Sequence, residues 1–246
     1  MANESVEMNK SHELTAWKSI RVAVTGGTSG LGLALVRMLL DQGASVAFIA
    51  RNRDRVERLM CERSDARGIT GDVSQKDDTY SIAIQILGEL GGLDILINNA
   101  SSLGPVPLAP LADTNCEDFE RALQTNVLGP FRLTKALLGA LAASAREGGH
   151  PLVVNISSDA AISAYPNWGA YGASKAALHH LSGIWNAELA PHGVQVISWD
   201  PGDMDTPLHA VAVPDADSTT LKRPEDVARE LVSKISDLSL SVREAS

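Results

Sequence analysis

The sequence predicts an α/β fold in which one parallel β-sheet is covered by helices on both faces. Two observations support this fold class. Short segments of strand length alternate with longer helical ones from Ile20 onward, and the short segments are near-continuous apolar runs, as in strands that are buried on both sides. We therefore expect one doubly wound domain over residues 19–246, preceded by a polar and flexible tail over residues 1–18.

Each predicted element has a local reason. Glycine is a favourable residue at the end of a helix, as at Gly43 and Gly91. Proline is favourable in the first turn of a helix, as at Pro224. The long helix over 117–145 is expected to be broken or bent near Gly129 and Pro130. The expected strands cover 20–25, 45–50, about 67–72, 93–99, 151–157 and 194–199, and the helices cover 31–43, 52–60, 75–90, 117–145, 169–190 and 224–235.

Composition narrows the function. The chain has 246 residues and a formal net charge of -9, so it would repel nucleic acid and anionic lipid. No apolar run reaches the roughly 18 residues that span a bilayer. Cys61 and Cys116 lack metal-ligand spacing, so neither a metal site nor a disulfide is expected. The sequence predicts a cytoplasmic protein without nucleic-acid or membrane partners.

A glycine-rich turn between the first strand and the first helix predicts a nucleotide site. The segment T-G-G-T-S-G-L-G allows a tight turn and lets a pyrophosphate approach the helix N-terminus. Such turns are also common structural punctuation, which is the alternative. The residues expected to bind the cofactor here are Gly26, Thr28, Ser29, Gly30, Leu31 and Gly32.

The end of the second strand bears on the choice of nucleotide. A carboxylate there would bind the ribose hydroxyls of NAD, but the sequence has Ala50, Arg51 and Asn52. A guanidinium can bind a 2′-phosphate through charge-assisted hydrogen bonds. We expect Arg51 and Asn52 to bind NADP(H) in preference to NAD(H), although a solvated arginine at the start of a helix is the alternative.

Two further pairs of residues, each at the end of a predicted strand, are candidates to bind the cofactor. Asp72 and Val73 follow the third strand, where a carboxylate can accept a hydrogen bond from adenine, and Asn99 and Ala100 close the fourth. Asn and Asp also favour ordinary turns, so each pair alone has a structural alternative. Their order along the chain favours binding of the cofactor.

Tyr171 and Lys175 predict proton chemistry. They lie four positions apart, on one side of a helix, where an ammonium favours the ionised form of a phenol. A packed tyrosine with a solvated lysine is the alternative. Ser158 ends a predicted strand thirteen residues before Tyr171, where ligands bind in open α/β sheets. Asn126 is a polar residue in an apolar helical stretch, where it can also simply bond its own backbone.

Taken together, these motifs resemble the short-chain dehydrogenase/reductase family. T-G-x-x-x-G-x-G, N-N-A, Asn126, Ser158, Y-x-x-x-K and P-G-x-x-x-T occur in this order between about Ile20 and Thr206. The resemblance implies a Rossmann fold with a seven-stranded or slightly reduced sheet, and a nicotinamide cofactor.

The resemblance also implies residue roles. Tyr171 would be the general acid in carbonyl reduction and the general base in alcohol oxidation. Lys175 would bind the nicotinamide ribose and lower the pKa of Tyr171. Ser158 would polarise the substrate oxygen, and Asn126 would hold a water in a proton relay. In the P-G-D-M-D-T turn, Thr206 would bind the nicotinamide carboxamide, and the flanking residues expected at the cofactor are Pro201, Gly202 and Met204.

The sequence departs from the family pattern at three places. Ser29 stands where many NADP-preferring members carry a basic residue, and Ser101 replaces the glycine of N-N-A-G. The C-terminus lacks the usual D-G-G strand ending. A homo-oligomer is expected, either a dimer through the helices at 117–145 and 169–190 or a tetramer.

The leading hypothesis is an NADP(H)-dependent oxidoreductase that reversibly reduces a ketone or aldehyde to an alcohol. The expected substrate pocket contains Ser158, Tyr165, Trp168 and Leu208, an apolar and partly aromatic surface suited to small or aromatic ketones. These residues could instead cover the core. The alternatives are a non-catalytic NADP-binding sensor, a structural oligomer and, on short matches, an enzyme similar to sepiapterin reductases that acts on a pterin side-chain carbonyl.

Overall fold

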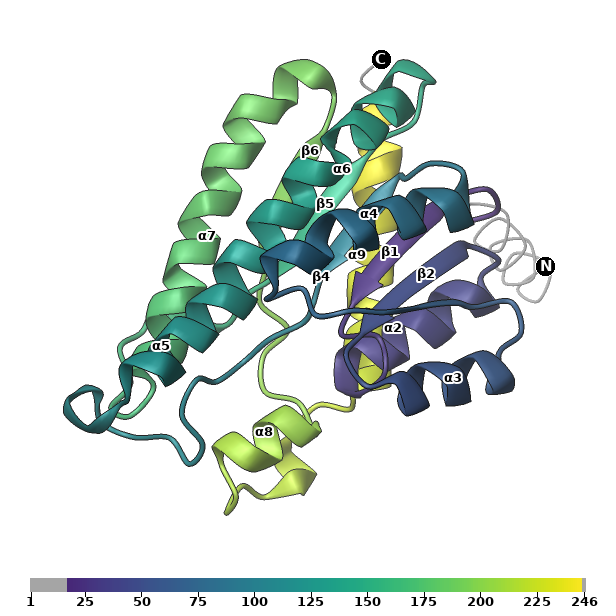
Figure 1. Ribbon diagram of the computed structural model, residues 1–246. Coiled ribbons are helices and arrows are strands. Elements are labelled where there is room, and N and C mark those ends of the chain that lie inside the picture. Colours follow the sequence, from purple (N-terminus) through teal and green to yellow (C-terminus); the bar gives the residue numbers. More distant parts are fainter. Residues whose placement is uncertain (1–16, 245–246) are drawn as a thin grey trace, which may run out of the picture.

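The computed structural model describes residues 17–244, with side chains described to Leu238. Six parallel strands form one sheet in the order β3-β2-β1-β4-β5-β6, with helices on both faces (Figure 1). The fold class predicted from the sequence is thereby confirmed. Within this part of the chain the sheet has six strands, the reduced form of the seven-stranded sheet that the resemblance implied.

The element boundaries follow the predicted ones closely. The strands are β1 (Arg21–Thr25), β2 (Ser45–Ala50), β3 (Arg67–Thr70), β4 (Ile95–Asn98), β5 (Leu152–Ile156) and β6 (Gln195–Trp199). The helices are α2 (Gly30–Asp41), α3 (Arg53–Glu62), α4 (Lys76–Leu90), α5 (Cys116–Leu123), α6 (Gly129–Arg146), α7 (Gly169–Leu189), α8 (Pro207–Ala212) and α9 (Pro224–Glu244), with short 3-10 turns that include η3 (Asp159–Ala161).

Alternate residues of the central strands divide the core into two layers. Val22 and Val24 of β1 pack with apolar side chains of α2, α3 and α9 on one face. Ala23, between them, faces α4, α6 and α7 on the other. Because Val22, Ala23 and Val24 are all fully buried, the strand is covered from both sides.

The direction of strand order reverses between β1 and β4, which pair directly. Crossovers from β1 lead to β2 and β3 on one side, and those from β4 lead to β5 and β6 on the other. A doubly wound sheet opens a crevice at the carboxyl ends of the strands at such a switch point. The turn after β1 and the residues after β4 therefore lie beside each other at this edge.

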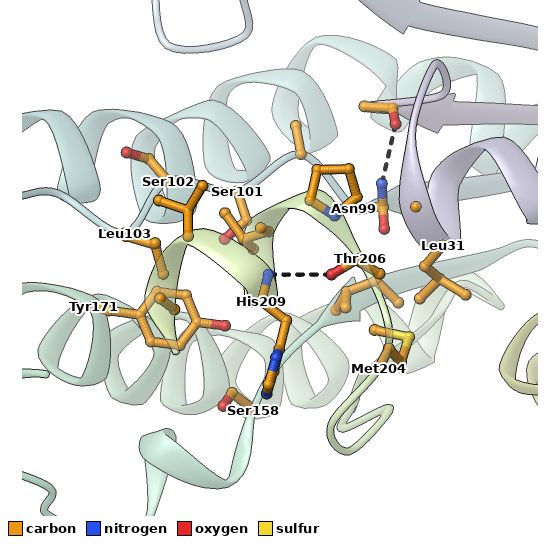
Figure 2. A pocket seen from close by; sticks show the side chains of 18 of the residues that line it. Leu31, Asn99, Ser101, Ser102, Leu103, Ser158, Tyr171, Met204, Thr206 and His209 are labelled. Carbon is orange, nitrogen blue, oxygen red and sulfur yellow. Dashed lines mark hydrogen bonds between the residues drawn. The ribbon is translucent and has the colours of Figure 1, made fainter. Parts of the chain in front are cut away.

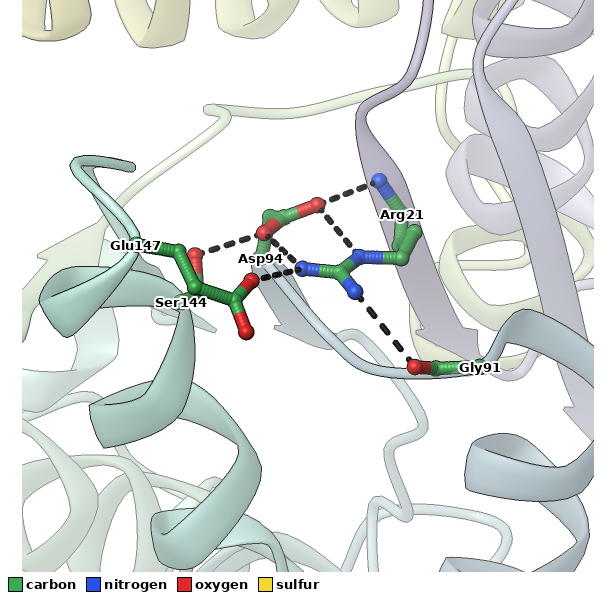
Figure 3. Close-up of polar contacts among 5 residues, drawn as sticks. All are labelled: Arg21, Gly91, Asp94, Ser144 and Glu147. Atoms are coloured by element: carbon green, nitrogen blue, oxygen red, sulfur yellow. Dashed lines mark hydrogen bonds and ion pairs between the residues drawn. The ribbon is translucent and has the colours of Figure 1, made fainter.

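The opposite edge of the sheet is held by a polar cluster around Asp94 (Figure 3). Arg21 donates to both carboxylate oxygens of Asp94, from Nε at 2.9 Å and from Nη2 at 2.8 Å. Ser144 Oγ donates to Asp94 Oδ1 at 2.6 Å. Burial opposes ionisation of Asp94, but these hydrogen bonds outweigh it and hold its pKa below the usual value. The cluster ties β1, the residue before β4 and the end of α6 together.

The polar tail predicted over residues 1–18 ends earlier than expected. Trp17 is only 4% exposed and packs into the core layer of α2 and α9; residues 1–16 lie outside the described residues.

The long helix predicted over 117–145 is interrupted near Gly129 and Pro130, as expected. A π-helical turn at residues 124–128 forms the interruption, and α6 begins directly after it at Gly129, with Pro130 in its first turn.

Three features of the described residues bear on membranes, metal ions and thiols. None of the helices between residues 17 and 244 is both long and apolar enough to cross a membrane. In the same stretch no three His, Cys, Asp or Glu side chains are grouped so that they could bind a metal ion. Cys61 and Cys116 are both exposed free thiols.

Candidate functional site

A cleft of about 1120 Å³ opens at the carboxyl edge of the sheet (Figure 2). Its floor is formed by the strand ends, and its walls by the turn after β1, the segment after β4, the start of α7 and the α8 region. The predicted cofactor residues that line it are Gly26, Thr28, Ser29, Gly30, Leu31, Arg51, Asn52, Asp72, Val73, Asn99, Ala100, Tyr171, Lys175, Pro201, Gly202, Met204 and Thr206.

Gly32 is the predicted cofactor residue that does not line the cleft. A Cβ at this position would lie 2.2 Å from Gly26 O and 2.5 Å from the Asn99 side chain. Gly32 therefore lets α2 approach the turn, while Gly26 and Gly30 adopt φ values of 70° and 50° that favour glycine. Gly32 therefore shapes the turn only, whereas Gly26 and Gly30 both shape the turn and line the cleft.

Thr25 holds the segment after β4 against the turn, a role that the sequence reading missed. Its Oγ1 accepts hydrogen bonds from Asn99 N at 2.9 Å and Ala100 N at 3.0 Å. Asn99 Nδ2 donates to Thr25 O at 2.8 Å. Thr25 is the last residue of a buried strand. The only sign of this contact in the sequence is a hydroxyl-bearing residue within an apolar run.

The end of the cleft beside β2 carries positive charge. Arg51 and Arg55 line the cleft, and within residues 17–244 neither guanidinium has a hydrogen-bond or ion-pair partner. Arg53 differs, because it pairs with Glu57 at 2.8 Å. Asn52 caps α3 by accepting from Arg55 N at 2.9 Å. Two uncompensated guanidinium groups therefore face the cleft where β2 ends in Ala50.

Asp72 and Thr206 each fix the backbone near the cleft. Asp72 Oδ1 accepts from Ser74 N at 2.9 Å and from Ser74 Oγ at 2.8 Å, which leaves its second oxygen for another partner. Thr206 caps α8 by accepting from His209 N at 3.2 Å. Asp200, which precedes Pro201, accepts from Gly202 N at 2.9 Å. These turns are ordered by their own side chains.

Tyr171 and Lys175 lie on the same side of α7 and are 8% and 2% exposed. Lys175 Nζ donates to Ile156 O at 2.7 Å and lies 5.4 Å from the centre of the Tyr171 ring. Burial lowers the pKa of Lys175 to about 8. Burial also raises the pKa of Tyr171 to about 12, against hydrogen bonds from Ser158 and Ser101 that lower it.

The expectation that Lys175 lowers the pKa of Tyr171 is not met in this structure. The ammonium lies over the ring and bonds a backbone carbonyl, so it is not directed at the phenol oxygen. Desolvation of the phenol therefore dominates. The carboxylates of Asp200 and Asp159 further favour the neutral phenol.

Ser158 lies just beyond the end of β5 and faces the Tyr171 phenol, near enough to lower the pKa of that group. Its Oγ caps η3 by accepting from Ala160 N at 3.2 Å, and it donates to Asp159 Oδ1 at 3.1 Å. The structure thus brings together the two hydroxyls that sequence spacing alone could only suggest.

Asn126 lies in the π-helical turn, fully buried behind the cleft. Its Nδ2 donates to Ser102 O and to Ser174 Oγ, both at 2.8 Å. Its Oδ1 accepts from Ser102 N at 2.8 Å and from Ser101 Oγ at 3.2 Å. The side chain thus joins α7 to the segment after β4, and the relay water stays a prediction.

The predicted substrate residues Tyr165, Trp168 and Leu208 line the other end of the cleft. Tyr165 donates to Asp159 Oδ2 at 2.7 Å. Trp168 meets the Tyr171 ring edge-on, with ring centres 5.6 Å apart. Further residues line the cleft that the sequence reasoning did not assign to the site. Among them are Arg55 and Arg121 on helices and Ser102, Leu103, Asp159, Asp200, Asp203 and Asp217 outside the α-helices and strands. Their positions in the chain carry no motif that could have identified them.

Comparison with known proteins supports a redox function for this cleft. The sequence profile of the family described as short chain dehydrogenase matches residues 21–217. L-fucose dehydrogenase of Mus musculus is 32% identical over 195 residues, covering 79% of this chain and 69% of that protein.

Two solved structures are also similar. One is 3-ketoacyl-(acyl-carrier-protein) reductase from Brucella melitensis complexed with NADH, with a TM-score of 0.80, 26% identity and coverage of 87% of this chain and 90% of that one. The other is a short chain dehydrogenase from Shigella flexneri complexed with NADP, with a TM-score of 0.79, 26% identity and coverage of 86% and 88%. The chain belongs to the short-chain dehydrogenase/reductase family of oxidoreductases.

Proposed function

We propose that this protein is an NADP(H)-dependent oxidoreductase that reduces a ketone or aldehyde to an alcohol and also catalyses the reverse reaction. The observation that carries the proposal is that the Tyr171 and Ser158 side chains line the cleft together, with Lys175 buried on the same helix as Tyr171. A phenol and a hydroxyl directed to one point can bind one substrate oxygen.

The residues of the cleft fit a nicotinamide cofactor. Gly26 and Gly30 hold the turn open at the N-terminus of α2, where a pyrophosphate would be stabilised. The bound cofactor would supply or accept the hydride. Lys175 would hold the ribose hydroxyls, and Thr206 the carboxamide.

The roles of Ser158 and Tyr171 would follow from the negative charge that develops on the substrate oxygen. As the carbonyl carbon gains a hydride, its oxygen becomes alkoxide-like, and donors fixed in advance stabilise that charge. Ser158 would donate a hydrogen bond to this oxygen, and Tyr171 would transfer its proton to it. In the reverse direction Tyr171 must first be ionised, so alcohol oxidation would be favoured at alkaline pH.

Preference for NADP(H) is supported by the end of β2. Ala50 offers no carboxylate to the ribose, and Arg51 and Arg55 present uncompensated positive charge to the cleft. Similar proteins have been seen with either nucleotide, so the proposal depends on these residues. The 2′-phosphate would take both guanidinium groups as partners.

The other end of the cleft supports an apolar or aromatic carbonyl substrate. Trp168, Leu208 and the exposed Val211 provide apolar surface there, and all line the cleft. Burial of such surface on binding favours aryl and alkyl ketones over small hydrophilic ones.

The experiment is oxidation of NADPH or NADH with a panel of aryl ketones, diketones, aldehydes, sugars and pterins, followed by loss of absorbance of the reduced nicotinamide. We expect turnover with at least one apolar ketone, faster with NADPH, and loss of at least about a thousandfold in Tyr171→Phe. Tight NADPH binding without turnover on any substrate would instead favour a sensor, and turnover unaffected by Tyr171→Phe would remove Tyr171 from the mechanism.

We also propose a homo-oligomer assembled through the outward faces of α5, α6 and α7. Ile184 on α7 is 43% exposed and supports an apolar contact there. Sedimentation velocity with Ile184→Glu tests it: a dimer or tetramer that dissociates in the variant fits the proposal, and a monomeric parent protein contradicts it.

A further inference from the structure

Ser101 occupies an unusual place between the buried Asn126 and the Tyr171 phenol. It follows β4 directly after N-N-A and lines the cleft together with Tyr171 (Figure 2). Its hydroxyl donates to Asn126 Oδ1 at 3.2 Å and lies near enough to the Tyr171 phenol to lower the pKa of that group. A glycine at this position, as in N-N-A-G, would offer Tyr171 nothing.

The two hydroxyls that reach Tyr171 differ in what else they bind. Ser158 directs its proton to the carboxylate of Asp159 at 3.1 Å, and its oxygen accepts from Ala160 N. Ser101 directs its proton to the neutral amide oxygen of Asn126, at a longer distance of 3.2 Å. A hydrogen bond to an ionised acceptor is roughly twice as strong as one to a neutral acceptor.

It follows that the Ser101 proton is the easier one to redirect. The acceptor that it would leave, Asn126 Oδ1, keeps a shorter hydrogen bond of 2.8 Å from Ser102 N. No buried acceptor is therefore left without a partner when Ser101 turns away. The corresponding turn of Ser158 would take a donor from a carboxylate.

We propose that Ser101 is a further residue of the proton-transfer site, whose hydroxyl turns from Asn126 to the Tyr171 oxygen when that oxygen gives up its proton. The Tyr171 proton passes to the substrate oxygen, and Ser101 keeps its own proton throughout and only reorients. Ser101 thus stabilises the phenolate form, while the neutral phenol can donate to the Ser101 oxygen. The kinetic consequence rests on the proposed function, whereas the stabilisation of the phenolate does not.

Other charges near Tyr171 set the background for this effect. Lys175 lies over its ring, and Asp159 and Asp200 oppose its ionisation. Arg121 from α5, paired with Asp118, and His209 from α8 line the same cleft, as does Asp203. A substitution at Ser101 removes none of these charged groups. A shift in the Tyr171 pKa caused by that substitution can therefore be attributed to the Ser101 hydroxyl.

The first test is the pH dependence of alcohol oxidation in Ser101→Ala. Loss of a donor to the phenolate should move the alkaline rise in kcat/KM up by about half to one pH unit, and lower the rate below that rise by about threefold to tenfold. Ser101→Thr, which restores a hydroxyl, should return the midpoint toward that of the parent protein. An unchanged midpoint in Ser101→Ala overturns the proposal.

Ser102→Ala is the matched control. Its hydroxyl accepts from Gly104 N at 3.3 Å, and its contacts with Asn126 come from the backbone alone. Removal of this neighbouring hydroxyl should leave the midpoint in place. An equal shift in both variants would indicate disturbance of the loop and contradict a specific role of Ser101.

The second test needs no substrate. The chain has three tyrosines, Tyr80, Tyr165 and Tyr171, so a Tyr80→Phe/Tyr165→Phe protein contains Tyr171 alone. Because the pKa of Tyr171 is about 12, the ultraviolet absorbance of its tyrosinate is followed from about pH 8 to the highest pH at which circular dichroism shows the fold intact, and it reports the rising part of the ionisation of this one phenol. Adding Ser101→Ala should shift the ionisation to higher pH, and an absent shift overturns the proposal even if no substrate has been found.

Discussion

Lys175 donates a hydrogen bond from its ammonium to the backbone carbonyl of Ile156 across 2.7 Å, in a site where it is 2% exposed. Among the described residues no carboxylate is ion-paired with it. A buried ammonium without a counter-charge opposes folding, which is why the pKa of Lys175 is lowered to about 8.

Replacement of Lys175 by methionine is therefore expected to stabilise the fold while it abolishes turnover. The pKa of Lys175 falls from its ordinary value of 10.5 to about 8, which corresponds to a cost of about 3 kcal/mol at neutral pH as an upper estimate. Thermal unfolding at pH 7 should show a Tm several degrees higher in the variant.

The pH dependence checks the cause. Because the folded pKa is the lower one, the unfolded chain binds more protons between about pH 8 and 10.5, and the stability of the parent protein rises with pH in this window. The advantage of Lys175→Met should therefore shrink between pH 8 and 10. An advantage that does not change with pH would point to packing instead of charge.

Arg51 and Arg55 are expected to decide the nucleotide. Arg51→Ala should raise the KM for NADPH by about tenfold or more, because one charge-assisted contact with phosphate is lost, and should leave the KM for NADH similar. Steady-state kinetics with both nucleotides measure this, and Arg55→Ala should act in the same direction. Arg53→Ala is the matched control, since Arg53 pairs with Glu57. Equal loss with both nucleotides would refute contact with the 2′-phosphate.

Gly32 should tolerate no side chain. In Gly32→Ala the new Cβ would meet Gly26 O at 2.2 Å, so the turn must move, at a cost of roughly 1–3 kcal/mol. Isothermal calorimetry should show weakened NADPH binding, and urea unfolding a lower midpoint. The control is Gly88→Ala in α4, where a Cβ would meet nothing within 4 Å; this change should raise stability by about 0.5–1 kcal/mol.

The cluster of Figure 3 should control stability and leave activity unchanged. Asp94→Asn removes the partly buried charge opposite Arg21 and is expected to cost roughly 2–4 kcal/mol, with kcat/KM retained. Asp65→Asn, in an exposed pair with Arg63, should cost less than about 1 kcal/mol. Urea unfolding of both variants gives the comparison, and similar costs would contradict the role of burial.

Low pH should reduce the stability of the fold through protonation of Asp94. The folded pKa of Asp94 lies below its usual value, so its contribution is present above that usual value and is lost as pH falls through the folded pKa. Stability of the parent protein should therefore fall more steeply than that of Asp94→Asn in the acid range, and parallel acid curves would exclude this contribution.

Local patterns were enough to predict the strands and the turn after β1. Apolar runs report burial, and glycines with positive φ mark the turn, so both features can be read from neighbouring residues. The proximity of Tyr171 and Ser158 could also be predicted from local patterns. The spacing to Lys175 places Tyr171 on a helix, and the end of a predicted strand places Ser158 at the edge of the sheet.

Features that depend on distant partners could not be read in this way. The phenol is less acidic than its lysine neighbour suggested, because burial by several elements outweighs a pair that spacing alone brings together. Thr25 and Trp17 gain their roles from segments far along the chain. Whether Asn126 bonds its own backbone or another loop is likewise decided by the path of that loop.

The π-helical turn at residues 124–128 carries one more residue than an α-helical turn would. Deletion of a single residue there would convert the widened turn into an α-helical one, and α5 and α6 would keep their faces, because the extra residue is absorbed within the turn itself. Arg121 would stay in the cleft and Ala122 in the core, whereas Asn126, which lies inside the turn, would lose its place against Ser102 and Ser174. The extra residue therefore positions the side chains of the turn and leaves the helices on either side where they are.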